Sequence, residues 1–531
     1  MLALAYSLAC ADTTADRPRG AAPLDTDSTV DSATDTAADT AADTASDSDT
    51  APPPTGTATI SAHPSNPFAM LVEVTIDRDA EVHVVYGQSA LDRRTPSRLV
   101  RANTPTTIPV LGLRAGRSWR FRAAAEGWES EELAMRTDPL STSWPVCTPS
   151  FLVDEAEFSP NEVVCSNARY GGWGHAYVCW DRSGQPVHAV RTPDDDSLFS
   201  MSPLPNGGFA STAYTSSKLL LFDDLGIQTT QYNVSWFSDT RFEHHYVDVH
   251  ELTPITEGDW AGAVLFLTGV YDWFSDGSYK LGNGLIVYDP GSDEVLWDYS
   301  FHGELGDGVA MDPLLPYSRA GLGDYAEDWT HANSVLHGID DEGDFFLISL
   351  KAQDWVVKLR PSTDQLEWAL GPDGSFDFVQ HIDGDLPEDR ADWMYHQHGM
   401  SWVGREGSRM RVLMYDNGYP RQDESGIRWD LDYSRVVELE LDEATARADL
   451  RYAYGETSGE DWFFSTSRGN AFLLPDGQRA MFLSGEQLRM AEVTYPGGQL
   501  RWAMQCPYDD EGMYRVRWAP DLYSLGWALG G

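Results

Sequence analysis

Short β-hairpins repeat along this chain from about residue 140 onward. An apolar strand, a turn containing Asp, Gly or Pro, and a second strand often carrying Trp or Tyr recur six times: "AYVCWDRSGQPVHAV", "LLLFDDLGIQTTQYN", "LIVYDPGSDEVLWDYSF", "WVVKLRPSTDQLEWALG", "RVVELELDEATARADLRYAY" and "MAEVTYPGGQLRWAM". A further hairpin precedes five of them, as in "HANSVLHGIDDEGDFFLISL". Two hairpins make one four-stranded blade, and helical periodicity is nearly absent. We therefore predict an all-β chain in which residues 140–531 form a six-bladed β-propeller.

A different rhythm precedes the repeat. Residues 56–139 contain the short strands "LVEVTI", "EVHVVYG", "TTIPVLGL" and "SWRFRAAAE", which predict a small β-sandwich resembling a fibronectin type III module. Residues 1–55 contain ten Asp and two Arg, with almost no branched apolar or aromatic residues after Cys10. Such a composition cannot bury a core, so residues 11–55 are predicted to be a disordered acidic linker.

The chain starts "MLALAYSLAC", a short apolar run that ends in small residues and a cysteine. This run resembles the end of a bacterial lipoprotein signal, with Cys10 as the candidate for lipidation. It departs from that pattern at Ser7, where Leu is usual, and in having no Lys or Arg before the run, so an ordinary cleaved signal is the alternative. We predict an export signal over residues 1–10 and a periplasmic or cell-surface protein.

Export makes the remaining cysteines candidates for disulfides. Three pairings are open to Cys147, Cys165, Cys179 and Cys506, and none of these cysteines has the spacing of a zinc site. Closure of a propeller ring brings the first and last blades together. This favours the pairs Cys147–Cys506 and Cys165–Cys179.

The formal net charge is −46, of which −8 lies in the acidic segment before the β-sandwich. A field of that sign repels nucleic acid and anionic membranes, although it allows one small anion to be held locally. No apolar run approaches the roughly 18 to 20 residues that a membrane span requires. Nucleic acid is therefore excluded as a partner, and a membrane-spanning segment is not expected.

Three histidines occupy equivalent positions of the repeat. His250 in "DVHELTP", His331 in "DWTHANSV" and His398 in "HQHGMSW" each begin the first hairpin of units three, four and five. The first strand of each blade lines the central channel of a propeller, so the three side chains are expected to converge. Asn333 follows His331 by two positions, and on a strand both side chains project to one side, as do those of His396 and His398.

Several segments resemble the bacterial arylsulfotransferases, which transfer sulfuryl groups without a nucleotide donor. The resemblance rests on "DWTHANSV", "QHGMSW", "VLMYDNG", "GNAFLLPDGQ" and "YRVRWAPDLY", and it covers most of the repeat. It implies a six-bladed propeller after an N-terminal β-domain, in an exported protein. It also implies a phenolic sulfate as donor and a phenol as acceptor, with neither a cofactor nor a metal.

The resemblance further implies a ping-pong transfer through a sulfohistidine. The family nucleophile, the His of the "QH" motif, matches His398, and its "HxN" pair matches His331 and Asn333. Its upstream "HE" or "HD" histidine matches His250 best. A second histidine gives a proton to the departing phenolate and later removes one from the acceptor, and both His331 and His250 are candidates.

For the upstream histidine, His244 and His245 in "FEHHYVDVHEL" are weaker alternatives. Four aromatic residues flank the motifs and are candidates for holding an aryl ring: Trp329, Trp393, Tyr395 and Trp402.

One position departs from the family pattern. The family usually has Arg after the "HxN" hairpin, where this chain reads "LISLKAQDW" and offers Lys351. Lysine keeps the positive charge but loses the planar fork that grips two sulfate oxygens at once. Arg421 and Arg435 are candidates for supplying a fork, with salt bridges as their other interpretation.

Two rival interpretations remain open. In the first, His396 and His398 with Asp392, or the three repeat histidines together, bind zinc or iron. Such a site usually includes a carboxylate, so Glu251 or Asp328 has to turn inward. In the second, the propeller is a non-enzymatic binding module whose axial polar residues only seal the channel.

Overall fold

The computed structural model describes most of the chain after residue 51. The described residues are 52–64, 66–170, 174–192, 196–204, 208–213, 216–223, 226–233, 237, 240–275, 277–304, 327–380, 393–423, 426–428, 433–455, 463–507 and 512–524. The predicted export signal with Cys10, nearly all of the predicted linker, and Asp392 lie outside them.

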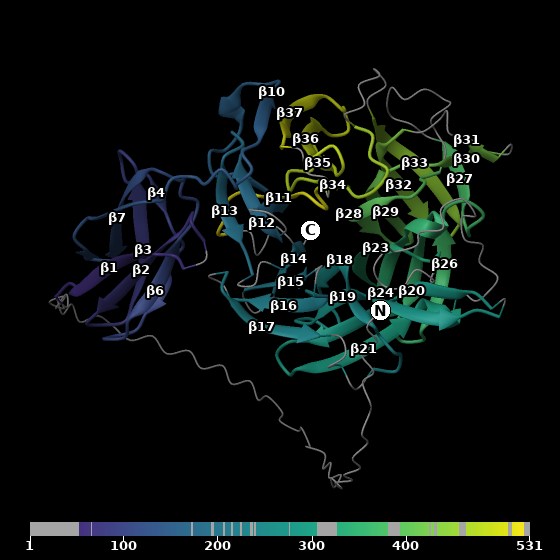
Figure 1. The fold of residues 1–531 in the computed structure, drawn as a ribbon, viewed down its shortest axis with the longest axis horizontal. Coiled ribbons are helices and arrows are strands. Elements are labelled where there is room, and N and C mark those ends of the chain that lie inside the picture. The colour runs from purple at the N-terminus through teal and green to yellow at the C-terminus, as the bar shows by residue number, and fades with distance from the viewer. Residues whose placement is uncertain are drawn as a thin grey trace, which may run out of the picture. The chain divides into compact units, whose positions relative to one another are not determined.

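Two sheets form from residues 56–136 (purple and dark blue in Figure 1). One contains β1 (Gly56–Ala62), β2 (Met70–Ile76) and β6 (Thr106–Val110). The other contains β3 (Ala80–Gly87), β4 (Arg93–Arg94), β5 (Arg98–Val100), β7 (Ser118–Ala125), β8 (Trp128–Glu129) and β9 (Leu133–Arg136). Strand β2, "MLVEVTI", alternates buried and more exposed positions, which directs Val72 and Val74 into a core shared with Trp119 and Phe121.

Six further sheets fill the remaining described residues. The first contains β11 (Val163–Tyr170), β12 (Gly174–Asp181), β13 (Pro186–Val190) and β38 (Arg517–Ala519). The second contains β14 (Leu198–Pro203), β15 (Phe209–Ala213), β16 (Lys218–Phe222) and β17 (Gln228–Asn233). The third contains β18 (Tyr246–Pro254), β19 (Val264–Trp273), β20 (Tyr279–Asp289) and β21 (Glu294–Ser300), with β22 (Glu327–Asp328) beside β20.

The other three sheets follow in chain order. The fourth contains β23 (Ala332–Asp340), β24 (Gly343–Leu350), β25 (Trp355–Arg360) and β26 (Gln365–Leu370). The fifth contains β28 (His398–Glu406), β29 (Arg409–Asp416), β32 (Arg435–Asp442), β33 (Arg447–Tyr454) and β27 (Asp377–Gln380). The sixth contains β34 (Asn470–Leu473), β35 (Arg479–Ser484), β36 (Arg489–Thr494), β37 (Leu500–Gln505) and β10 (Thr148–Phe151).

The predicted all-β class is confirmed. In the second to sixth sheets, each pair of predicted hairpins joins into one antiparallel sheet. A short two-stranded ribbon of β30 (Arg421–Asp423) and β31 (Gly426–Arg428) stands apart from these sheets. The helices in the described residues are all short: α1 (Phe301–Glu304), η1 (Glu155–Glu157) and η3 (Lys351–Gln353). Central strands such as "GDFFLISL" of β24 are buried on both faces, which explains their continuous apolar runs.

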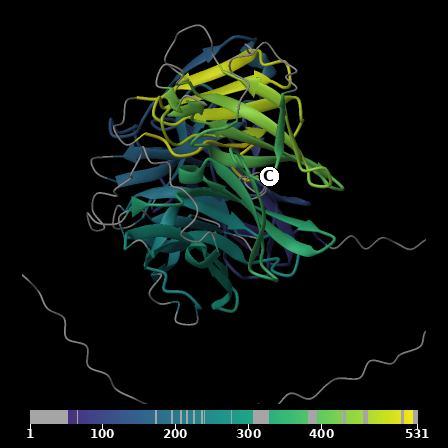
Figure 2. The same ribbon diagram turned by 90° about the vertical axis from the view of Figure 1, so that its right-hand side faces the viewer.

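Strands from distant parts of the chain complete the first and last sheets. Strand β38 pairs with β11, with Val163 opposite Ala519, and β10 pairs with β37, with Thr148 opposite Gln505. Figures 1 and 2 show the yellow C-terminal strands beside blue strands from the start of the repeat. The hairpin repeat did not predict these exchanged strands, because each is a single strand outside any hairpin.

The predicted disulfide pairing is confirmed: Cys147 bonds to Cys506, and Cys165 to Cys179. The first bond ties the residue before β10 to the residue after β37, so it secures one of the exchanged strands. In the second, both cysteines stand opposite each other on β11 and β12. Two disulfides fit a protein that is exported to an oxidising compartment.

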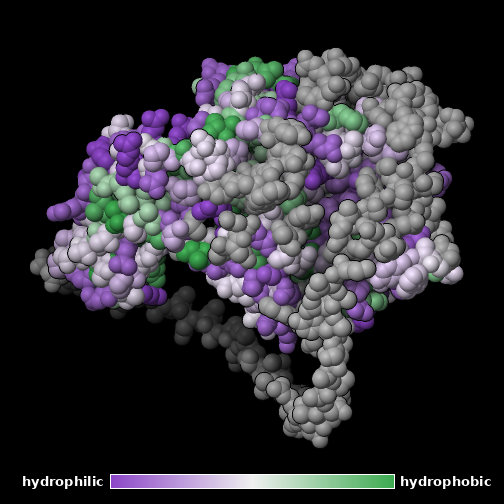
Figure 3. All heavy atoms as spheres, viewed as in Figure 1, coloured by the Kyte–Doolittle hydropathy of each residue, from purple (hydrophilic) through white to green (hydrophobic). Residues whose placement is uncertain are grey.

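The visible surface is mainly hydrophilic where it is described (Figure 3). Large exposed apolar side chains are scattered, and Trp273 is the most exposed of them at 67%. Among the described residues, no helix has the length and apolar character needed to cross a membrane.

Candidate active site

Strands β18, β23 and β28 lie side by side and run in the same direction. Their contacts show this, because the residue numbers rise together on β23 and β28, and on β18 the ring contact of His250 with His331 comes before the contacts with Val335. The contacts are Val335 N to Glu251 Oε2 (3.1 Å), Thr253 Oγ1 to Val335 O (3.3 Å), Asn333 Nδ2 to Gln397 O (2.7 Å), Met400 N to Ser334 Oγ (3.1 Å) and Trp402 Nε1 to His337 O (3.1 Å). Equivalent positions of the three strands are therefore neighbours in space.

The three repeat histidines converge, His250 from the middle of β18, His331 from just before β23 and His398 from the start of β28. The ring centroids of His250 and His331 are 4.9 Å apart, and those of His331 and His398 are 6.3 Å apart. The ring of Tyr514 stands edge-on to His250 at 5.4 Å. The exposed fractions of the histidine side chains are 12%, 13% and 2% in chain order. Residues from three separate repeat units thus form one cluster.

Irregular strand pairing accompanies each histidine. The register shifts between Val247 and Leu252 in β18, between Ala332 and Ser334 in β23, and between His398 and Ser401 in β28. Bulges of this kind change the direction of a side chain relative to the regular pleat.

The simple alternation that we used for His331 with Asn333, and for His396 with His398, therefore does not apply. Both His331 and His396 lie before their strands begin and have positive φ angles of 46° and 55°.

The backbone conformation and close packing at position 399 explain why a glycine follows His398. Its φ is +58°, and a Cβ at this position would overlap Asn470 and the backbone oxygen of Gly469, on β34 and the residue before it. The glycine thus allows β28 to approach the next sheet closely at the residue that follows the histidine.

The hydrogen bonds of His398 fix its tautomer. Asn417 Nδ2 donates to the carbonyls of Ser465 (2.7 Å) and Arg468 (3.0 Å), so its Oδ1 is the atom that faces His398 Nδ1 at 2.6 Å. The carbonyl of His396 lies 3.1 Å from the same nitrogen. Because both neighbours accept, Nδ1 carries the proton and Nε2 carries the lone pair.

Carboxylates fix the other two histidines in the same way. His331 Nδ1 donates to Asp328 Oδ2 at 2.7 Å, and His250 Nδ1 donates to Asp248 Oδ1. Asn283 links Asp248 to the two residues that flank His331. Its Nδ2 donates to Asp248 Oδ2 at 3.3 Å, and its Oδ1 accepts from Thr330 Oγ1 (2.8 Å) and Ala332 N (2.7 Å). All three rings are thereby oriented with Nε2 as the nitrogen opposite the support.

Burial and one cation keep the imidazoles of His331 and His398 neutral. Burial lowers the pKa of His331 to about 4, against the attraction of Asp328 and with the help of Lys351. The pKa of His398 lies well below its usual value because the ring is buried and because Lys351 and His331 are near, although the hydrogen bond to Asn417 opposes this. Neutral imidazole is the nucleophilic form.

Lys351 lies in the same region as the histidines, as the sequence predicted. It begins η3, its side chain is 1% exposed, and its backbone N–H donates to the carbonyl of His331 at 3.2 Å. The positive charge of Lys351 lowers the pKa of His331, His396 and His398. It is therefore the cation placed to act on an anion bound beside the histidines.

Asn333 supports the nucleophile strand. Its Nδ2 donates to the carbonyl of Gln397, the residue before His398, and the side chain is fully buried. The backbone carbonyl of Asn333 accepts from Tyr514 Oη (2.9 Å) and from Arg515 Nη2 (2.5 Å). Asn333 thus joins three segments, and its contacts are those of a positioning residue.

The alternative histidines lie elsewhere. His244 is hydrogen-bonded to Thr268 Oγ1 at 2.6 Å, and the ring of His245 packs against Tyr271 at 5.1 Å. His396 is fully buried behind the cluster, where its backbone N–H donates to Asp354 Oδ1 at 2.5 Å.

The candidate arginines form buried salt bridges. Arg421 Nη2 and Arg435 Nε both donate to Asp416 Oδ2, at 2.8 and 2.7 Å, and both side chains are 1% exposed. The same residue's Oδ1 accepts from the backbone N–H of Tyr395 at 2.9 Å. Because Asp416 precedes Asn417, this ion cluster stabilises the turn that holds His398.

The aromatic candidates also separate. Trp329 is fully buried and packs edge-on against Phe274 at 4.8 Å, and Trp393 packs against Phe378 at 4.5 Å. Tyr395 lies 5.6 Å from the guanidinium of Arg421. Trp402 lines a cavity that is described below.

The carboxylates that a metal site would use have other partners. Glu251 accepts from both Arg515 Nη1 (3.0 and 2.8 Å) and the backbone N–H of Val335, while Asp328 accepts from His331. Within the described part of the chain, no group of three or more His, Cys, Asp or Glu side chains has a metal-binding arrangement. The donor set here is better suited to an anion than to a cation.

Sequence reasoning missed four residues of this site as supports: Asp248, Asp328, Asn417 and Tyr514. Asp248 stands two positions before His250, and Asn417 belongs to the "YDNG" motif, so both were visible in the sequence. Their hydrogen-bond partners were not, because these depend on bulges and positive φ angles that no local pattern specifies.

One comparison with known proteins covers the hairpin repeat that contains the three histidines. The profile of a family described as "Arylsulfotransferase (ASST)" matches residues 176–515. Two proteins named arylsulfate sulfotransferase AssT, from Escherichia coli O6:H1 and from Lelliottia amnigena, are each 26% identical over 176 residues. These alignments cover 30% of this chain and 28% of each relative.

Similarity to solved structures is weak. A protein of unknown function from Bacteroides caccae is 9% identical, with a TM-score of 0.37, and it covers 67% of this chain and 98% of its own. A virginiamycin B lyase from Staphylococcus aureus is also 9% identical, with a TM-score of 0.29, and covers 69% and 100%. Scores this low carry no argument about fold or function.

Proposed function

Because the chain belongs to the arylsulfotransferase family, we propose that it is a nucleotide-independent sulfotransferase. It moves a sulfuryl group from a phenolic sulfate ester to a phenol through a sulfohistidine on His398. The observation that carries this proposal is the fixed tautomer of His398, whose Nδ1 is bound to Asn417. That arrangement supports Nε2 as a neutral nucleophile beside two other oriented histidines and a buried ammonium group.

The transfer has two balanced halves. First, His398 Nε2 attacks the sulfur of the donor, so that an N–S bond forms and the S–O bond to the aryl oxygen breaks, releasing a phenolate. The oxygen of an acceptor phenol then attacks the same sulfur, the N–S bond breaks, and the phenol proton passes to a base. We assign this base to His331, because its ring lies beside both other histidines and its bond to Asp328 leaves the lone pair on Nε2. The proton that His331 takes from the acceptor is then passed to the next departing phenolate.

Negative charge develops on the sulfuryl oxygens and the leaving oxygen during both halves. Lys351 is the proposed stabiliser, since its charge already acts on His331 and His398. The family's usual Arg would present two parallel N–H groups, whereas Lys351 presents a compact charge. His250, held by Asp248, is the proposed second donor toward the sulfuryl oxygens in its protonated form, in which Nε2 also carries a hydrogen.

The architecture proposed with this function is a closed six-bladed propeller over residues 140–531, after a β-sandwich over residues 56–139. The exchanged strands β10 and β38 and the Cys147–Cys506 bond support closure, because they link the first and last sheets. Export to the periplasm or the cell surface is part of the same proposal and is supported by the two disulfides.

Trapping the intermediate tests the function directly. The full chain is mixed with 4-nitrophenyl sulfate without a nucleotide or an acceptor, and peptides are examined by mass spectrometry. We expect a stoichiometric burst of 4-nitrophenolate and one sulfuryl group on the peptide that contains His398, with and without a chelator.

Other outcomes separate the rival functions. An adduct on another residue contradicts the assignment of His398. Loss of the burst with chelator supports a metal enzyme, and no burst with several aryl sulfates supports a non-enzymatic binding module.

The lowered histidine pKa values predict an unusual pH profile. The value of kcat/KM for 4-nitrophenyl sulfate reports the first half-reaction, in which the leaving nitrophenolate needs no proton. An ordinary histidine, with a pKa of about 6.5, loses nucleophilicity below pH 6.5. Because the pKa of His331 is about 4 and that of His398 is also lowered, kcat/KM should stay level as the pH falls to about 5 and should decline only below it.

Initial rates between pH 4 and 8 check this, with circular dichroism at each pH to show that the chain stays folded. A decline centred near pH 6.5 in folded protein would contradict the neutral, desolvated cluster.

A further inference from the structure

A cavity lies beyond the histidine cluster along strands β18, β23 and β28. Its volume is about 400 Å³, and its walls come from the parts of β18, β23 and β28 that follow the histidines. Residues 251–254 line it from β18, residues 335–339 from β23, and Met400, Trp402 and Gly404 from β28. Because the strands run in parallel, this cavity follows the histidine cluster along all three strands.

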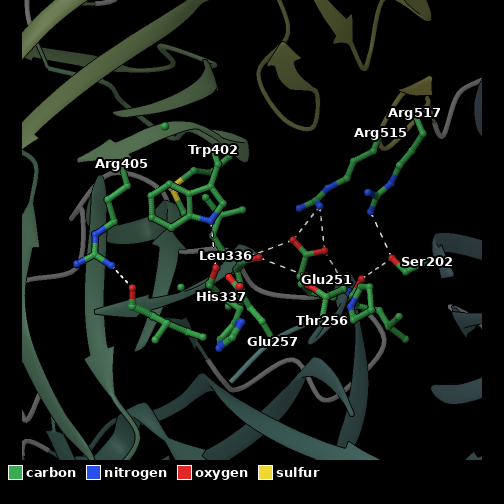
Figure 4. Close-up of a pocket in the computed structure, with 18 residues that line it drawn as sticks. Ser202, Glu251, Thr256, Glu257, Leu336, His337, Trp402, Arg405, Arg515 and Arg517 are labelled. Atoms are coloured by element: carbon green, nitrogen blue, oxygen red, sulfur yellow. Dashed lines mark hydrogen bonds and ion pairs between the residues drawn. The ribbon is translucent and has the colours of Figure 1, made fainter. Parts of the chain in front are cut away.

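A polar partition separates the two sites. Arg515 Nη1 donates to both oxygens of Glu251, and its Nη2 donates to the carbonyl of Asn333. Figure 4 shows Arg515 and Glu251 meeting at the wall of the cavity. The described lining residues include both of these side chains but none of the three histidines. The cavity is thus a separate space rather than an extension of the candidate active site.

Two of the three arginines that line the cavity, Arg515 and Arg517, differ in their contact with Glu251. Arg515 is bound to Glu251 by two hydrogen bonds, whereas Arg517 donates from its Nη2 to Ser202 Oγ at 3.4 Å. Burial lowers the pKa of Arg517, and the charge of Arg515 acts in the same direction. An anion placed beside Arg517 would relieve this cost. Such a locally positive wall is unusual in a chain with a net charge of −46.

Part of the wall is apolar. Leu252, Val335, Leu336 and Met400 line the cavity together with the ring of Trp402, which is held in place by donating from Nε1 to the carbonyl of His337. Figure 4 shows Trp402 and Arg517 on either side of Glu251 and Leu336. A space of this size that combines an apolar patch with charged groups can hold a small organic molecule that has both an apolar and a charged part.

We propose that this cavity is a second binding site that takes a small aromatic monoanion, with its charged group at Arg517 and its ring against Trp402. The ligand carries a single carboxylate, sulfonate or sulfate group. Glu251 and Glu257, which also line the cavity, disfavour ligands of higher negative charge. The site requires no chemistry at His398 and stands independently of the proposed sulfuryl transfer.

The test locates the ligand directly. Crystals of the full chain are soaked with 4-bromobenzenesulfonate, which cannot transfer a sulfuryl group, and the bromine is located by its anomalous signal. We expect a bromine position inside the cavity near Trp402. A signal confined to the histidine cluster, or no signal at millimolar ligand, would overturn the proposal.

Calorimetry with the same probe measures which side chains hold it. Arg517→Gln should weaken binding at the cavity by about 10-fold or more, because a charge-assisted hydrogen bond is lost. His398→Gln should leave this binding unchanged, as should Arg409→Gln, which alters an arginine whose side chain is 64% exposed. 4-Bromobenzyl alcohol, the uncharged control, should bind at least 10-fold more weakly than the sulfonate.

If Arg517→Gln does not fold, Trp402→Ala replaces it, with the same expected loss. Unchanged affinity in a folded Arg517→Gln or Trp402→Ala protein would contradict the assignment. Because the probe cannot react, this result is independent of whether the chain transfers sulfuryl groups.

Discussion

Replacing His398 with glutamine should lower kcat for transfer from 4-nitrophenyl sulfate to a phenol by about 10⁴-fold or more, because the nucleophile of a covalent mechanism has no substitute. Glutamine is close to histidine in length and still has an amide to meet Asn417, so the fold of the turn should persist. Steady-state kinetics and burst measurements on purified protein check this, and both the burst and the turnover should vanish together.

The matched control is His245→Gln. His245 is 31% exposed on its side chain and packs against Tyr271, away from the cluster, so its replacement should change kcat by less than twofold. If His398→Gln kept a tenth of the activity or more, His398 would not be the nucleophile. A similar loss in His245→Gln would point to a general effect on folding.

Replacing Lys351 with methionine should lower kcat/KM by about 10²- to 10³-fold, the usual cost of losing one stabilising group at a developing anion. Methionine keeps much of the length of the side chain in a site that is 1% exposed, so the charge is the main change. A second effect distinguishes this from a packing defect. Because Lys351 lowers the pKa of His331 and His398, its loss should raise both and move the acid decline of kcat/KM to higher pH.

Two further variants complete the Lys351 series. Lys351→Arg restores the charge and adds the planar fork usual in the family, so its activity should equal or exceed that of the native chain. Lys218→Met removes a lysine that bonds to Gln231 on the second sheet and should have no effect. Normal activity and an unmoved pH profile in Lys351→Met would rule out the proposed role of this ammonium group.

The sequence predicted the strands within each sheet better than it predicted the strand pairs that join the two ends of the repeat. Hairpins are local, so turn residues and apolar alternation were enough to find the strands of five complete sheets. Strands β10 and β38 pair with partners from the opposite end of the repeat, and neither strand belongs to a hairpin. Only the cysteines carried that information, because Cys147 and Cys506 flank one of the exchanged pairs.

The candidate site was also predicted only in part from the sequence. Equivalent repeat positions were enough to predict that His250, His331 and His398 meet, since the repeat fixes which strands are neighbours. The hydrogen-bond supports were not predictable from spacing. Asn417 directly follows β29 and bonds to His398 at the start of the neighbouring strand β28. The buried salt bridges of Asp416 with Arg421 and Arg435 stabilise this turn, so the geometry depends on residues from several segments.

The exchange of β38 also sets an order in time. Residues 514–519 contribute Tyr514 beside His250, Arg515 beside Glu251, and β38 of the first sheet. Strands β11 to β13 of the same sheet are made much earlier, because they lie near the start of the repeat. At synthesis rates of about 5–20 residues per second, the first sheet waits for many seconds with one edge unpaired. An emerging chain is thus without a finished histidine cluster until residues 514–519 have been made.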